Sequence, residues 1–226
     1  DAFRRCGVSR RFAGKTVEGW KPQGRANTTA RELLLAYSQN IRERARDGRG
    51  LALLGPVGIG KSHLACALVA DAIGAGLDAT YITWPAAITL HRDAQQGAKD
   101  NPARGLWREL EGADLLALDE LGLTPMTEWQ AGELFRLIDG RYQAQRATIV
   151  GGNLTADSLA SALGERVADR LRDMCALVPL SGESKRGQPP QTEPLRFPKP
   201  EPVKVEVWAG SRWVTRTIGG ERAHGR

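Results

Sequence analysis

The fold of this chain is decided by the stretch Gly55-Pro56-Val57-Gly58-Ile59-Gly60-Lys61-Ser62. It matches the pattern Gly-x-x-x-x-Gly-Lys-Ser/Thr in full, and it lies between the short apolar run at residues 51–54 and a run with helical periodicity. Its glycines allow the backbone to fold into a nest whose N–H groups point at phosphate oxygens, and the start of the helix adds a positive partial charge. We therefore predict a phosphate-binding loop that joins a buried strand to a helix.

The last residues of this loop have the chemistry that a bound nucleoside triphosphate requires. Lys61 is expected to reach the β- and γ-phosphates, and the Ser62 hydroxyl is expected to ligate Mg²⁺. His63 comes one step later, faces away from the phosphates, and is not expected to be catalytic. ATP and Mg²⁺ are thus the predicted cofactors. The residues expected to line the nucleotide are Gly55, Pro56, Val57, Gly58, Ile59, Gly60, Lys61, Ser62 and His63.

A second element of such a site is a carboxylate at the end of a neighbouring strand. The apolar run from Asp114 to Leu118 predicts a buried strand, and it delivers Asp119 and Glu120 at its carboxyl end, where ligands bind in parallel sheets. Asp119 is expected to hold the magnesium shell. Glu120 is expected to orient the attacking water or to accept its proton, which favours hydrolysis over transfer to a substrate hydroxyl.

The sequence on both sides of these motifs alternates between strand and helix patterns. Strands are predicted at residues 79–83, 147–150 and 176–180, with helices between them, including one that a capping box starts at Thr29 and one that is capped by Thr127. The fold class is therefore α/β, with a parallel sheet flanked by helices. The predicted divisions are a basic lead-in at 1–26, an ATPase domain at 27–186, a proline-rich linker at 187–202 and a β-hairpin tail at 203–226.

Three further polar residues are candidates for the site, and each has a structural alternative. Asn153 follows the strand at 147–150, so its amide would bond the water or the γ-phosphate, or else form an Asx turn. Arg166 and Arg170 are four apart on one helical face, where a cation would act on the phosphate of a neighbouring subunit or pair with nearby acids.

Composition limits the class of protein. The chain has 226 residues and a formal net charge of +6, with basic ends and an acidic middle. This charge pattern is compatible with a nucleic-acid partner, and equally with a soluble protein from a genome that uses much arginine. No apolar run approaches the ~18 residues of a membrane helix, so no membrane partner is expected. The three cysteines are odd in number and far apart, which excludes a disulfide framework and is typical of a cytoplasmic protein.

The order of these motifs resembles the AAA+ ATPases of the DnaC/IstB type, which are replicative helicase loaders and ATP-dependent helpers of transposases. The resemblance covers about residues 7–186. The segments that carry it are Gly58-Ile59-Gly60-Lys61-Ser62-His63-Leu64-Ala65, Asp119-Glu120-Leu121-Gly122, Thr148-Ile149-Val150-Gly151-Gly152-Asn153-Leu154-Thr155, Leu163-Gly164-Glu165-Arg166-Val167-Ala168-Asp169-Arg170-Leu171 and Gly182-Glu183-Ser184-Lys185-Arg186.

The resemblance implies a P-loop AAA+ fold, ATP hydrolysis and functional roles for three of the side chains. Asn153 becomes the sensor 1 residue, Arg170 is favoured over Arg166 as the arginine finger, and Arg186 becomes a sensor 2 candidate. It further implies a homo-oligomeric ring or spiral that holds single-stranded DNA, with a replicative DNA helicase as partner. A transposase partner on duplex DNA and a nucleotide-gated adaptor with little turnover remain the alternatives.

The resemblance also indicates where DNA would be held. The region from Pro85 to Glu111 is similar to the place where this clade has an extra helical insertion that contacts DNA. In the tail, Trp208 and Trp213 would stack on bases or form a cross-strand pair. The cations of the insertion are His91, Arg92, Lys99, Arg104 and Arg108.

Overall fold

The computed structural model describes residues 7–96, 101–184, 203–208 and 213–218, the last two ranges by their backbone alone. The chain divides into two compact units, Asp1–Gly187 and Gln188–Arg226, and each is considered by itself. The linker predicted at 187–202 lies outside the described residues.

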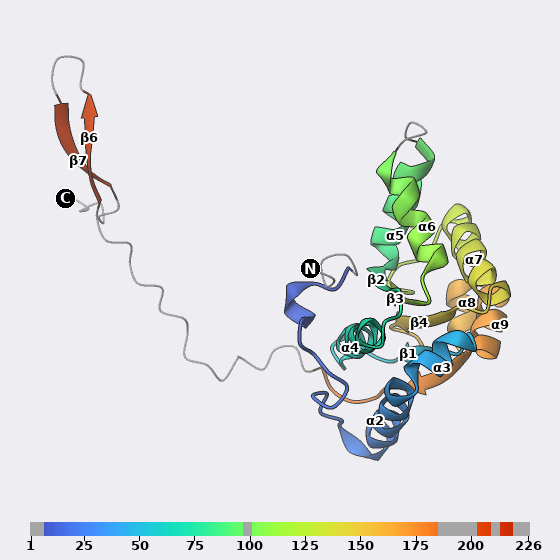
Figure 1. Ribbon diagram of the computed structural model, residues 1–226. Coiled ribbons are helices and arrows are strands. Elements are labelled where there is room, and N and C mark those ends of the chain that lie inside the picture. The colour runs from blue at the N-terminus through green and yellow to red at the C-terminus, as the bar shows by residue number, and fades with distance from the viewer. Residues whose placement is uncertain (1–6, 97–100, 185–202, 209–212, 219–226) are drawn as a thin grey trace. The chain divides into compact units, whose positions relative to one another are not determined.

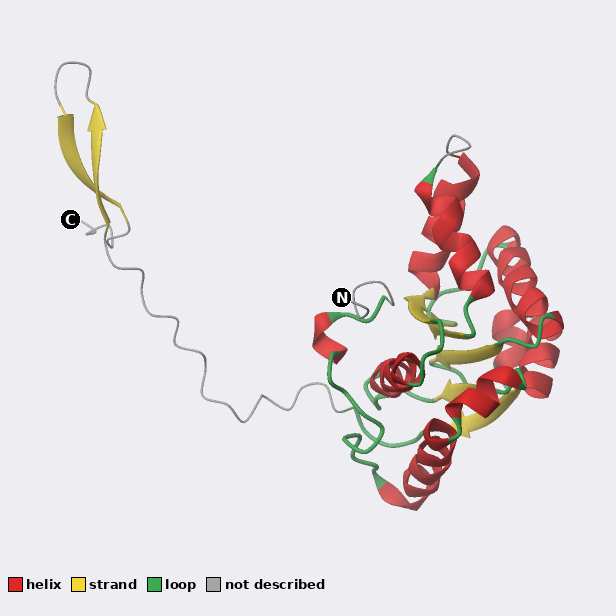
Figure 2. Ribbon diagram, in the orientation of Figure 1, coloured by secondary structure: helices red, strands yellow, loops and turns green. Residues whose placement is uncertain are grey.

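The first unit is built on a five-stranded sheet in which all neighbouring strands are parallel, in the order β2-β3-β4-β1-β5 (Figures 1 and 2). This arrangement confirms the α/β class expected from the alternation of strand and helix patterns. The strands are β1 (Gly50–Leu54), β2 (Ala79–Thr83), β3 (Leu115–Leu121), β4 (Ala147–Gly152) and β5 (Cys175–Pro179).

Helices cover both faces of this sheet, so its central strands are apolar on both sides. Alternate residues of β1 separate accordingly: Leu51 and Leu53 pack with α2, α3 and α4, whereas Ala52 and Leu54 pack with α5 to α9. The helices are α2 (Gly24–Gln39), α3 (Ile41–Arg46), α4 (Lys61–Gly74), α5 (Trp84–Gln96), α6 (Pro102–Gly112), α7 (Glu128–Gln143), α8 (Leu159–Leu163) and α9 (Glu165–Met174), and a short 3₁₀ helix, η1 (Arg10–Phe12), precedes them.

The two predicted helix starts have different outcomes. Thr127 caps α7 with a full capping box: its hydroxyl accepts from the Gln130 amide, and the Gln130 side chain accepts from the Thr127 amide. The start at Thr29 is wrong, because α2 begins at Gly24 and Thr29 lies inside it. Asn27, which is fully buried, bonds the Gln23 carbonyl and both backbone groups of Ser181, and so ties the first turn of α2 to the segment after β5.

Residues 17–20 of the lead-in pack onto the rest of the first unit. Val17 and Trp20 belong to the same buried cluster as α4, and Arg31 of α2 donates a hydrogen bond to the Glu18 carbonyl. At another edge of the unit, α5 and α6 pack together as a hairpin that projects beyond the sheet (Figure 1).

The second unit contains an antiparallel pair, β6 (Val203–Trp208) and β7 (Trp213–Ile218), in which Trp208 is the register partner of Trp213. The expected β-hairpin is therefore present. The division of the whole chain at residues 26, 186 and 202 remains a proposal. None of the helices in the described ranges combines the length and apolar character that a membrane span requires.

Candidate functional site

A cavity of about 910 Å³ lies at the carboxyl ends of the strands. It brings together the phosphate-binding loop, the end of β3 and the start of the loop after β4, as predicted for ligands in open parallel sheets. Residues of the lead-in complete its wall. The lining residues are Ser9, Arg11, Phe12, Lys15, Gly19, Trp20, Lys21, Val57, Gly58, Gly60, Lys61, Ser62, His63, Tyr81, Thr83, Asp119, Glu120, Leu121, Leu123, Gly152 and Asn153.

Two glycines allow the phosphate-binding loop its shape. Gly60, the residue before α4, has φ 112°, and a side chain there would collide with the indole of Trp20. Gly58 has φ 85°, and a side chain there would collide with Ser184. Both conformations are left-handed and both sites are crowded, so only glycine fits. The indole N–H of Trp20 also donates to the Ile59 carbonyl at 3.0 Å, which fixes the loop from the lead-in side.

Lys61 lies at the first position of α4 with its ammonium inside the loop. Its Nζ donates to the carbonyls of Gly55 and Pro56, each at 2.7 Å. The adjacent Ser62 faces the same cavity. The residues thus have the arrangement that the motif predicts, with backbone amides, a cation and a hydroxyl at one helix N-terminus.

His63 connects the loop to the lead-in. Its Nε2 lies 2.9 Å from the Thr16 carbonyl oxygen, although the ring also borders the cavity. This contact joins the histidine after the motif to the lead-in. Because His63 lines the same cavity as Lys61 and Ser62, the structure does not support the expectation that it faces away from the phosphates, and its lack of a catalytic part stays a prediction. Sequence reasoning did not single out Trp20 or Thr16 as supports of the loop, because the supporting contacts join residues about forty positions apart.

Asp119 is 2% exposed, and both of its oxygens are hydrogen-bonded. Oδ1 accepts from the Glu120 amide at 2.8 Å, and Oδ2 accepts from the Tyr81 hydroxyl at 2.9 Å. Burial, and after it the charge of Asp119, raise the pKa of Tyr81, so its hydroxyl stays protonated as a donor. A side chain on Gly151 would collide with Asp119 Oδ1, so β4 has glycine where the carboxylate crosses it.

Glu120 owes its position to an irregularity in β3. Its φ is 61°, which is unusual for a residue other than glycine, and the pairing register between β3 and β4 shifts between Leu118 and Leu121. This shift interrupts the alternation of the strand, and Glu120 is exposed at the cavity wall while Asp119 stays buried. Two adjacent carboxylates therefore have different surroundings, as their different expected roles require.

The residues expected to hold Mg²⁺ fit that ion. Magnesium prefers a few hard oxygen ligands from the protein and takes the rest from phosphates and water. Asp119 and Ser62 supply such oxygens in one cavity. Among the described residues no three His, Cys, Asp or Glu side chains come together as a metal cluster, so an ion here would depend on phosphate oxygens as well.

Of the remaining candidate site residues that the structure describes, one lines the cavity and the others do not. Asn153 is exposed and lines the cavity, as Glu120 does. Neither Arg166 nor Arg170 is among its described lining residues, so the structure does not bring them to the nucleotide site of their own chain. Arg186 lies outside the described residues.

Arg170 and Arg166 differ in their surroundings on α9. Arg170 Nε lies 2.9 Å from Asp139 Oδ1 of α7, and its guanidinium lies 4.8 Å from the centre of the Tyr142 ring. The Asp139 hydrogen bond raises the pKa of Arg170. Arg166 is exposed, and its guanidinium lies 5.7 Å from the centre of the Phe135 ring.

The expected DNA-contacting cations of the α5–α6 hairpin need one correction. His91 is buried rather than at the surface. The centre of its ring lies 4.0 Å from that of Trp107, with the two planes tilted by 45°, and its Nε2 lies 2.7 Å from Glu133 Oε2 on α7. Its role in the structure is to join the hairpin to α7. Arg92 and Arg108 are exposed, Arg104 is half-buried, and Lys99 lies outside the described residues.

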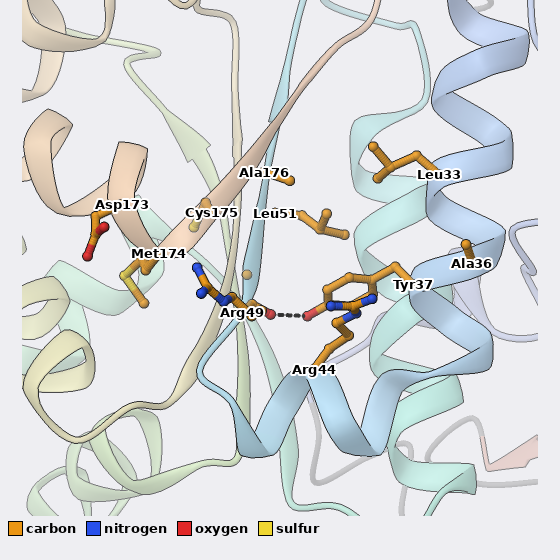
Figure 3. A pocket seen from close by; sticks show the side chains of 11 residues that line it. Leu33, Ala36, Tyr37, Arg44, Arg49, Leu51, Asp173, Met174, Cys175 and Ala176 are labelled. Carbon is orange, nitrogen blue, oxygen red and sulfur yellow. Dashed lines mark hydrogen bonds between the residues drawn. The ribbon is translucent and has the colours of Figure 1, made fainter.

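A second cavity, of about 400 Å³, lies at the opposite ends of the strands, between α2, β1 and β5 (Figure 3). The Tyr37 hydroxyl donates to the Arg49 carbonyl at 2.7 Å beside it, and Leu33 and Met174 form part of its largely apolar wall. Burial raises the pKa of Cys175 there to about 12. The phosphate-binding loop and the two carboxylates line the first cavity, so nucleotide chemistry belongs there.

Together, the parallel sheet, the glycine loop at a helix N-terminus and the carboxylate pair define a P-loop ATP-binding protein of the AAA+ type. Residues 30–192 match the family model described as IstB-like ATP binding protein, and the chain belongs to that family. This confirms the resemblance stated from the sequence motifs.

Several named proteins are similar to the chain. An insertion sequence IS21 ATP-binding protein of Pseudomonas aeruginosa is 32% identical over 59% of this chain and 51% of its own length. The replicative helicase loader DnaC of Escherichia coli K12 is 28% identical over 75% of this chain and 68% of its own length. The chain thus spans about half the length of the insertion-sequence relatives it matches.

Solved structures agree on the fold. A crystal structure of the DnaC helicase loader has a TM-score of 0.69 and 22% identity, covering 76% of this chain and all of that chain. The structure of DnaI gives 0.65 and 16% over 77% of this chain and 95% of that chain. At these identities the likeness establishes the architecture alone, which is the P-loop AAA+ fold.

Proposed function

We propose that the chain is an ATP-hydrolysing helicase loader that assembles on single-stranded DNA and delivers a replicative DNA helicase. The observation that carries the ATPase part is one cavity in which a P-loop lysine, a buried carboxylate, an exposed carboxylate and an amide face the same space. The loader part rests on the DnaC relatives, whose match extends over 75% of this chain against 59% for the IS21 relative.

In this proposal each residue has a defined task. The loop amides and Lys61 bind the phosphates, and Ser62 and Asp119 hold Mg²⁺, which when bound neutralises charge on the phosphate oxygens. Glu120, exposed to the cavity, orients a water molecule and accepts its proton. Asn153 hydrogen-bonds that water or the γ-phosphate, since it borders the same space.

Assembly would complete the site with a cation from a neighbouring copy. Arg170 remains our first candidate, and to act in trans its guanidinium must leave Asp139. Arg166 is the alternative, because it is already exposed on the same helix. Arg170→Ala should lose hydrolysis and regain it when mixed with Lys61→Ala subunits, which supply Arg170 without a working loop. If only Arg166→Ala behaves in this way, the finger is Arg166.

A second candidate function is that of a transposition helper acting on duplex DNA with a transposase. It is supported by the insertion-sequence relatives, which have the higher identities, 32% and 33%. A nucleotide-gated adaptor with little turnover is the third, and an exposed Glu120 beside the loop argues against it.

The test is ATP hydrolysis by the purified chain across a protein concentration series, with single-stranded DNA, duplex DNA or neither. We expect specific activity to rise steeply with concentration and to be stimulated by single-stranded DNA. Stimulation by duplex alone would instead support the transposition helper. ATP binding without hydrolysis under every condition would contradict the ATPase assignment and leave the adaptor.

A further inference from the structure

Tyr81 lies on the face of β2 that looks toward the phosphate-binding loop. In the register between β2 and β3, Thr83 is paired with Asp119 and Tyr81 with Ala117. The backbone of Tyr81 therefore lies two residues, about 6.6 Å along the strand, before the level of Asp119. A tyrosine is long enough to span that distance along the sheet. Its hydroxyl ends 2.9 Å from Asp119 Oδ2, at the wall of the ATP cavity.

The same side chain borders the cavity that the phosphate-binding loop lines. Tyr81, Ser62 and Asp119 all belong to the wall of this cavity. The Tyr81 hydroxyl therefore bonds one of the two residues that would hold Mg²⁺, Asp119 on β3, in the space that the other, Ser62 on α4, also faces.

The carboxylate depends on these donors for its orientation. Asp119 is 2% exposed, and a buried carboxylate is stable only where hydrogen bonds replace its water. The Glu120 amide fixes Oδ1, and Tyr81 fixes Oδ2. Since Tyr81 is neutral, it adds no charge that would compete with a cation, and a carboxylate oxygen can accept a hydrogen bond while it faces a metal-bound water.

We propose that the Tyr81 hydroxyl is a positioning group for the Mg²⁺ site, which holds the Asp119 carboxylate in the orientation that the ion requires. The inference rests on the proposed ATPase function and adds to it a residue of this chain. A purely structural role would require only the aromatic ring, which packs against the buried cluster around α4. The phenol oxygen is the part that bonds the carboxylate.

The test is Tyr81→Phe, which keeps the ring and removes the oxygen. Affinity for a fluorescent ATP analogue is measured in EDTA and across a Mg²⁺ series, and Mn²⁺ binding is read directly by electron paramagnetic resonance. We expect wild-type affinity in EDTA and about a tenfold or greater rise in the half-saturating Mg²⁺ and Mn²⁺ concentrations, the size typical of lost outer-shell partners. Tyr37→Phe, which removes a buried hydroxyl at the far end of the sheet, should leave all these values unchanged.

Three results would overturn the proposal: an unchanged metal dependence, a tighter metal dependence, which would make the hydroxyl a competitor, or an equal loss of affinity in EDTA. Asp119→Asn separates this failure from failure of the proposed function. If Asp119→Asn abolishes the metal dependence while Tyr81→Phe does not, only the role of Tyr81 is wrong. If neither variant changes it, the magnesium assignment itself fails.

Discussion

Gly151 should not tolerate the smallest side chain, because a methyl group there would occupy the position of Asp119 Oδ1. Its backbone conformation is not in the left-handed region, so alanine is allowed in principle and the collision is the only obstacle. Asp119 would have to rotate and give up the 2.8 Å hydrogen bond from the Glu120 amide. Gly151→Ala therefore tests the position of the Asp119 carboxylate without adding strain to the backbone.

The magnitude follows from that single bond. A hydrogen bond to a charged group contributes about 1.5–3 kcal/mol, and replacing glycine by alanine returns about 0.5–1 kcal/mol through the unfolded chain. Gly151→Ala should therefore lower the free energy of unfolding by about 0.5–2.5 kcal/mol. Gly132→Ala is the matched control, because Gly132 lies inside α7 with open space around its Cα and should stabilise the chain by about 0.5–1 kcal/mol.

Urea unfolding of both variants, followed by tryptophan fluorescence, measures this difference, and ATP-analogue binding with and without Mg²⁺ measures its functional consequence. Gly151→Ala should lose the Mg²⁺-dependent part of binding, whereas Gly132→Ala should keep it. Equal unfolding midpoints together with wild-type Mg²⁺ dependence would mean that Asp119 does not lie against β4, and the arrangement of the site described here would be refuted.

Three other perturbations test separate parts of the structure. Glu120→Gln should bind ATP normally and hydrolyse it at least about 100-fold more slowly, and hydrolysis at the wild-type rate would contradict its assignment as the base. Arg141→Met should reduce the free energy of unfolding by about 3 kcal/mol or more, measured by denaturant titration, because this arginine is 1% exposed and bonds the carbonyls of Leu110, Ala113 and Ala147. In a Cys6→Ser background, Cys175 should resist iodoacetamide at pH 8 until the chain unfolds: burial raises its folded pKa to about 12, above the unfolded value, so thiolate is scarce in the native state.

Local sequence signals are sufficient to predict the sheet and the cluster of polar side chains at the carboxyl ends of its strands. The run at residues 51–54 is apolar on both faces because helices cover both, and parallel strands place their carboxyl ends together. Asp119, Glu120 and Asn153 could therefore be assigned to one edge before any coordinates were known, and they do meet in one cavity.

Local sequence patterns predict the structure wrongly where a long-range contact overrides them. Thr29 and Glu32 have the spacing of a capping box, yet the buried Asn27 bonds Ser181 and the helix starts five residues earlier than Thr29. The bulge that exposes Glu120 depends on the register with β4, and the need for glycine at Gly151 depends on a side chain of the neighbouring strand. Neither can be deduced from one strand alone.

The phosphate-binding loop shows the same division between local and distant causes. Its eight residues specify the chemistry, but segments from both ends of the first unit hold its shape. Trp20 of the lead-in bonds the Ile59 carbonyl, and Ser184, in the segment that follows β5, lies against Gly58. Asn27 holds this segment through Ser181, 154 positions further along the chain. The motif therefore needs the whole first unit around it to have the conformation that binds phosphate.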